Sequence, residues 1–279
     1  MSETAVTPAK ERSSTMDKPE RWTTHSQMST PGRYLEPITA LPRDVGSLIH
    51  LIQGLLVHAD WVAEYGLDAT KVSATARKTL PMAERLYDVL QRDSRSFENE
   101  RPAERRSLGT CRDFALMLCS MLRCQGIPAR IRCGFAAYFG GKWEDHWVCE
   151  YWDARAGLWR LGDAQVDQML TLRNRIEFDP ADVPRIAFLT AGEAWLRCRA
   201  IQSDPILFGH GDVTGLWFVK VNVCRDHYAL NDNETSSWDR WREASQAERS
   251  VPQKEITLLD DLATHPAQKL MEIRQNWMT

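Results

Sequence analysis

The stretch from residue 109 to residue 165 constrains the fold of this chain more than any other part. It opens with GTCRDFALMLCSMLRC, where apolar residues recur at the three- and four-residue spacing of a buried helix. A Gly and a Pro then end the helix. Three strands are predicted next, at 129–139, 143–152 and 158–165. A helix followed by an antiparallel meander is typical of the α+β class.

Outside this stretch the patterns predict a tail and further helices. Residues 1–33 are rich in Ser, Thr, Pro, Lys and Glu, and we expect a disordered, flexible tail because they offer little apolar surface to bury. We expect a core domain at 34–170 and a mainly helical extension at 171–279 that packs on it. The helices expected beyond the central one lie at 42–61, 81–91, 191–201, 216–227, 237–250 and 258–278.

The composition argues against several classes of protein. Of 279 residues, 43% are hydrophobic and 26% charged, which is typical of a soluble globular protein. No segment approaches the roughly 20 apolar residues of a membrane span, and the start of the chain has no signal-peptide pattern. We therefore expect a cytoplasmic protein with no membrane partner. The net charge of -3 offers no positive excess for binding nucleic acid.

The cysteines predict reduced thiols rather than a disulfide framework. Seven is an odd number, and the chain contains neither a CxxC pair nor an HExxH motif. We therefore expect no metal and no cofactor. The cysteines stand at positions 111, 119, 124, 133, 149, 198 and 224. All but the first are interpreted as core side chains.

Cys111 is the candidate nucleophile. It follows Gly109-Thr110 and falls in the first turn of the predicted helix, where unpaired backbone N–H groups and the helix dipole favour an anion. Both a thiolate and a transient oxyanion would be stabilised there. The backbone N–H of Cys111 is the oxyanion-hole donor that the sequence predicts.

His146 is the candidate base, and a carboxylate is needed to orient its ring. Asp145 and Asp153 have the opposite parity, so they point to the other face of the second strand. If the hairpin turns from Asp153 to Gly157, the numbers of opposed residues sum to about 310, and residue 146 faces residue 163 or 164. Asp163 is the carboxylate at that place. It is therefore predicted to hold the imidazole.

These residues resemble a known family. The segments GTCRDFALMLCSMLRCQGIPARIRCGF, DHWVCEYWD and GLWRLGDA are similar, in order and spacing, to the motifs of the transglutaminase-like superfamily. The resemblance spans about residues 107–167. It implies a papain-like α+β core in which a nucleophile helix packs on an antiparallel sheet, with helical N- and C-terminal additions. It also implies that Cys111, His146 and Asp163 form a catalytic triad.

Together these observations predict an enzyme that transfers the acyl group of an amide or ester through a thioester on the cysteine. Hydrolysis of a peptide-like or small amide substrate is favoured, and an amide-forming acyltransferase is the first alternative. A non-catalytic binding protein on the same core is the alternative from another class. Trp143 and Trp147 are candidate substrate-binding residues, with cross-strand packing as the other interpretation. His210 and His227 are interpreted as structural, and the oligomeric state stays open.

Overall fold

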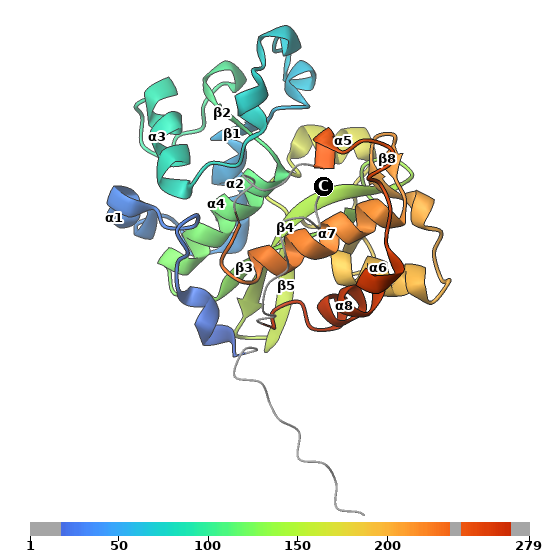
Figure 1. The fold of residues 1–279 in the computed structure, drawn as a ribbon. Helices are drawn as coiled ribbons and strands as arrows, with labels where there is room; N and C mark the ends of the chain where they lie inside the picture. Colours follow the sequence, from blue (N-terminus) through green and yellow to red (C-terminus); the bar gives the residue numbers. More distant parts are fainter. Residues whose placement is uncertain (1–17, 235–240, 269–279) are drawn as a thin grey trace, which may run out of the picture.

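The computed structural model describes residues 18–234 and 241–268. Across those residues the main sheet has the strand order β6-β3-β4-β7-β8, and β5 also pairs with β4. Figure 1 shows this sheet at the centre of the molecule, with α4 and α7 against it. The strands of this sheet are β3 (Ala129–Ala136), β4 (Trp143–Asp153), β5 (Leu158–Gly162), β6 (Phe188–Thr190), β7 (Phe208–His210) and β8 (Val213–Thr214).

The long strand β4 organises the sheet. On one edge it pairs antiparallel with β3, and His146 lies opposite Gly134. On its other edge two different strands pair with it: β5 runs antiparallel along 149–153, and β7 runs parallel at 143–144. His146 therefore lies between these two pairings, at a break in the sheet where another element can approach it.

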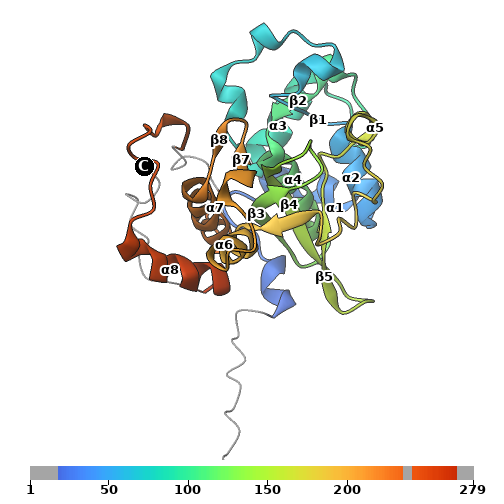
Figure 2. The ribbon, with the colours of Figure 1, turned by 90° about the vertical axis from the view of Figure 1, so that its right-hand side faces the viewer.

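The helices form two groups that both pack against the sheet. Figure 2 shows α6, α7 and α8 at one side of the molecule and α1 and α2 at the other, with β3 and β4 between them. The helices are α1 (Leu35–Thr39), α2 (Val45–Gln53), α3 (Met82–Arg92), α4 (Cys111–Cys124), α5 (Gln168–Asn174), α6 (Ala191–Arg199), α7 (Leu216–Ala229) and α8 (Gln253–Thr264). Ile131, Cys133 and Phe135 are alternate residues of β3 and share one face of it. Ile131 and Cys133 pack with the apolar cluster of α2 and α4, and Phe135 packs with that of α6–α8, so both groups contact this face at different points along the strand.

The central helix α4 is buried on nearly every side. Its residues from 112 to 123 are all buried, and it contacts both β3 and β4. A small parallel sheet of β1 (Leu56–His58) and β2 (Ser107–Gly109) leads into it. The predicted mixed α+β class and the predicted packing of this helix on the sheet are confirmed.

The ends of the chain differ from the expectation. Residues 18–33 do not form a free tail: Pro19–Thr23 is a 3-10 helix, and Trp22 is 1% exposed. A few large side chains suffice to hold this polar segment to the core, which average composition does not reveal. The first 17 residues of the expected tail lie outside the described residues.

The expected mainly helical extension also contributes strands, because β6 pairs with β3 and β7 pairs with β4. The helix expected at 237–250 is wrong where the structure describes it, since Trp241–Glu243 is a short 3-10 helix followed by turns. Residues 237–240 of that expected helix, and the last part of the one expected at 258–278, lie outside the described residues.

Candidate active site

The nucleophile candidate lies where the sequence predicted it. Cys111 is the first residue of α4, so its N–H has no carbonyl partner within the helix. Asp113 closes the start of the helix, because its Oδ2 accepts hydrogen bonds from the Thr110 N–H at 2.8 Å and from the Thr110 hydroxyl at 3.0 Å. The thiol is partly exposed, which leaves it open to a substrate.

The loop before Cys111 is fixed by a buried arginine. Arg85 of α3 donates from Nη2 to Asp113 Oδ1 at 2.7 Å. Its Nη1 donates to the Ser107 hydroxyl at 2.7 Å and to the Leu108 carbonyl at 2.6 Å. The same carboxylate therefore binds both the N-cap of α4 and a cation from α3. Together these bonds hold β2 and the first turn of α4 in one position.

His146 and Asp163 are in direct contact. The distance between His146 Nε2 and Asp163 Oδ2 is 2.8 Å, and both side chains are almost fully buried. The ring also interacts with the Cys111 side chain. The structure thus brings together the three residues that the sequence singled out, with the imidazole between the sulfur and the carboxylate.

Two further groups hold the Asp163 carboxylate. The buried hydroxyl of Tyr138 donates to Oδ2 at 2.6 Å, and the Gln165 N–H donates to Oδ1 at 3.0 Å. Burial and the carboxylate itself raise the pKa of Tyr138, so its hydroxyl remains a donor. The edges of the Tyr138 and Phe139 rings pack against His146. These contacts restrict the rotation of both triad partners.

The charge on His146 reflects two opposing influences. Burial disfavours the protonated ring, but the Asp163 carboxylate and the hydrogen bonds to Asp163 and Cys111 outweigh it and raise the pKa of His146 to about 10. The imidazole is therefore positively charged at neutral pH.

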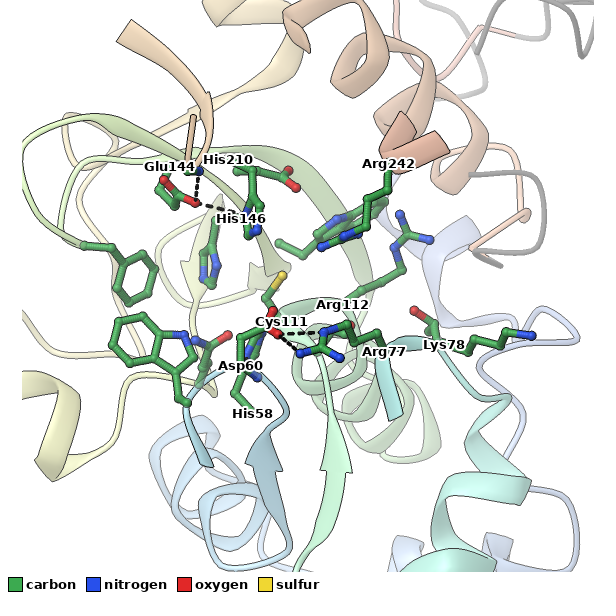
Figure 3. Close-up of a pocket in the computed structure, with 18 of the residues that line it drawn as sticks. His58, Asp60, Arg77, Lys78, Cys111, Arg112, Glu144, His146, His210 and Arg242 are labelled. Atoms are coloured by element: carbon green, nitrogen blue, oxygen red, sulfur yellow. Dashed lines mark hydrogen bonds and ion pairs between the residues drawn. The ribbon is translucent and has the colours of Figure 1, made fainter. Parts of the chain in front are cut away.

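Cys111 and His146 border a cavity of about 1090 Å³, which Figure 3 shows. Charged side chains of both signs line it: Asp60, Glu64, Arg77, Lys78, Arg112, Glu144, Asp145, Arg173, Arg225, Arg242 and Glu243. Several are paired across the cavity wall, as Arg77 is with Asp60 at 2.7 Å. Its walls include residues from β1 and α4 as well as from the C-terminal part of the chain. The active-site wall is thus not confined to the predicted core at 34–170.

The structure places only one of the two candidate substrate-binding tryptophans at the cavity. Trp147 lines the cavity, and the guanidinium of Arg112 lies 4.1 Å from its ring centroid. Trp143 is not among the lining residues and instead stacks on Phe208 with ring centroids 5.9 Å apart. His210, interpreted from sequence as structural, does line the cavity, and its Nδ1 lies 3.0 Å from Glu144 Oε1.

Sequence reasoning missed two residues of this site. Tyr138 lies just past β3, and the aromatic character of that strand gave no reason to single it out. His58 ends β1, is buried and lines the cavity, although it lies 53 positions before Cys111. The sequence signal that could have found it is the polar pair His58 and Asp60 at the end of a continuous apolar run.

The structure is thus a mixed α+β protein in which a cysteine, a histidine and an aspartate side chain lie together beside a cavity. Residues 68–164 match the family model described as the transglutaminase-like superfamily. The resemblance stated from the sequence is thereby confirmed for this stretch. The match includes all three residues of the site. Searches of the curated proteins and of the solved structures found no match.

Among the residues that the structure describes, no group of three or more His, Cys, Asp or Glu side chains is arranged to hold a metal ion. None of the helices in these ranges combines the length and the apolar character needed to cross a membrane.

Proposed function

We propose that this protein is a cysteine-dependent acyl-transfer enzyme that cleaves an amide or ester through a thioester on Cys111. The observation that carries the proposal is the buried His146–Asp163 pair beside the Cys111 thiol at a helix N-terminus. A thiol, an imidazole and a carboxylate in this order are what a cysteine nucleophile needs.

In the proposed reaction the Cys111 thiolate attacks the carbonyl carbon and the C=O electron pair moves onto oxygen. As the tetrahedral intermediate collapses, the C–N or C–O bond breaks. The His146 imidazolium gives its proton to the leaving amine or alcohol. Asp163 keeps the ring oriented throughout. The neutral imidazole then activates the second nucleophile, which attacks the thioester and releases Cys111.

Water is the second nucleophile that we favour. The cavity wall carries many charged side chains, and such a surface holds water instead of excluding it. A transferase has to keep water from the thioester while an amine binds. The substrate we propose is a peptide-like or small amide, and an amide-forming reaction remains the alternative outcome when an amine is supplied.

A binding protein that retains this core is the rival from another class. Such a protein has no physical need for a charged imidazole held between a thiol and a buried carboxylate. Tyr138 and the Gln165 N–H also donate hydrogen bonds that orient the Asp163 carboxylate. These contacts support catalysis over binding alone.

The test is the alkylation of the native protein by iodoacetamide, followed by peptide mapping. We expect Cys111 to be labelled first among the seven cysteines, because a thiolate reacts far faster than a thiol. Replacing His146 by Ala is expected to slow the labelling of Cys111. Cleavage of amide and ester libraries would then identify the substrate.

Cys124 at the other end of α4 is a matched internal control. It is also half-buried and its Sγ lies 3.6 Å from the Nε2 of His25, but burial raises its pKa to about 11. Its labelling should be slow and insensitive to His146→Ala. Equal, slow labelling of Cys111 and Cys124 would move the assignment to the binding protein.

A further inference from the structure

His58 occupies a position next to the nucleophile that the triad does not use. It is the last residue of β1 and lies opposite Gly109 of β2, two residues before Cys111. The Ala59 N–H donates to the Gly109 carbonyl at 2.8 Å, which holds the two strand ends together. His58 is 8% exposed and lines the same cavity as Cys111 (Figure 3).

One hydrogen bond assigns the tautomer of this ring. The Asp60 backbone N–H donates to His58 Nδ1 at 3.2 Å. Nδ1 is therefore an acceptor, and in the neutral ring the proton must lie on Nε2. Burial, together with nearby His146, lowers the pKa of His58 to about 4 in spite of the Asp60 carboxylate. The ring is thus neutral at physiological pH and presents one N–H.

The buried Asp113 carboxylate, whose charge acts on His58, does not compete for that N–H. Asp113 already accepts hydrogen bonds from Arg85, from the Leu80 N–H at 3.2 Å and from Thr110. Within the described part of the chain, no protein acceptor is paired with His58 Nε2. A donor without a protein partner, on a largely buried ring that borders a cavity, is suited to a ligand oxygen.

We propose that His58 supplies the second donor of the oxyanion hole, through Nε2–H, beside the backbone N–H of Cys111. This inference rests on the proposed acyl-transfer function. When Cys111 Sγ bonds to the carbonyl carbon, the negative charge that develops on oxygen receives both hydrogen bonds. When the C=O bond re-forms and the leaving group departs, the charge is removed, and His58 keeps its proton throughout. A neutral donor fits this role because it needs no proton transfer.

Two reactions of the same sulfur separate this role from a structural one. Acylation of Cys111 by p-nitrophenyl acetate passes through a tetrahedral oxyanion. Alkylation by iodoacetamide displaces iodide at a saturated carbon and forms no oxyanion at all. Loss of an oxyanion-hole donor should therefore slow acylation by about 10²- to 10³-fold and leave alkylation unchanged.

His58→Gln and His58→Asn form the matched pair of variants, measured in the full-length protein. The Gln amide N–H reaches about as far as Nε2, whereas the shorter Asn amide reaches only as far as Nδ1. We expect His58→Asn to show the full loss of acylation, His58→Gln to show a much smaller loss, and both to alkylate Cys111 at the unmodified rate.

The possible outcomes separate two kinds of failure. If His58→Asn is acylated as fast as the unmodified protein, or if acylation and alkylation fall in parallel in both variants, His58 is not an oxyanion donor. If the unmodified protein shows neither acylation nor preferential alkylation of Cys111, the proposed function itself fails, and the inference fails with it.

Discussion

The charge on His146 depends chiefly on one neighbour. Burial alone would lower the pKa of this ring, so the raised value of about 10 reflects Asp163 and, to a smaller degree, Cys111. The sign of the linkage to stability follows. Because the folded-state pKa lies above the ordinary value of 6.5, the stabilising contribution is fully present below pH 6.5 and is lost as the pH rises to about 10.

Asp163→Asn should therefore cost stability in a pH-dependent way. The substitution removes the carboxylate and returns the pKa of His146 toward 6.5. We expect the difference in the free energy of unfolding between the unmodified and Asn proteins to be large near pH 6.5 and to shrink steadily up to about pH 10. Urea titrations at several pH values would measure it. A difference that stays constant over this range would show that His146 is neutral in the folded state.

At the scale of the element, α4 is useful for chemistry only while its first turn is fixed. Arg85 provides much of that constraint, because it is buried and bonds Asp113, Ser107 and Leu108. Removing it leaves the Asp113 carboxylate buried without its cation, and such a loss is more costly than the loss of an exposed ion pair.

We predict that Arg85→Ala lowers the free energy of unfolding by about 3–5 kcal/mol. Arg92→Ala is the control on the same helix, since Arg92 pairs with Asp88 at 2.9 Å but is 38% exposed, and its loss should cost less than about 1 kcal/mol. Urea unfolding of the two variants would test this. Similar small losses in both would mean that Arg85 does not hold the nucleophile loop.

Of these two elements, α4 could be predicted from the sequence and β1 could not. The periodicity of α4 and the Gly109-Thr110 pair before it were enough to place Cys111 at a helix N-terminus. β1 was predicted as the end of a helix, because Leu55, Leu56 and Val57 continue the apolar run past Gly54 and a short run does not distinguish helix from strand. His58 was overlooked for this reason.

The predicted hairpin register identified Asp163 correctly, although the observed pairing of β4 and β5 differs slightly from the predicted one. The pairs of β4 and β5 sum to 311, as in Cys149 with Gly162, and the ladder ends there. Asp163 lies beyond the ladder, where its N–H donates to the Pro180 carbonyl at 2.8 Å. Its side chain then turns back to His146. Parity and approximate register identified the partner, but the contact depends on a loop that no local pattern predicts.

At the scale of the whole molecule, the predicted boundary at residue 170 divides a single sheet. The strands β6 and β7 have three residues each, too short to show a period, so their pairing with β3 and β4 was not visible in the sequence. The sequence also did not show whether the charged residues of α7 are buried or exposed. The structure shows that Asp226 and Arg225 are buried and bond Arg132 and Asp145 of the sheet.

We therefore predict that a chain ending at residue 170 does not fold, although it contains all three triad residues. Arg132 would lose Asp226, whose Oδ2 lies 2.8 Å from its Nη2, and Phe135 would lose the apolar cluster formed with α6–α8. One edge each of β3 and β4 would also lack a partner strand.

We expect this fragment to show no cooperative unfolding in urea and to label Cys111 no faster than Cys124. The full chain should unfold in one transition that is the same by fluorescence and by circular dichroism. A fragment that unfolds cooperatively and retains a reactive Cys111 would show that the catalytic core ends near residue 170, and that the C-terminal strands and helices only cover it.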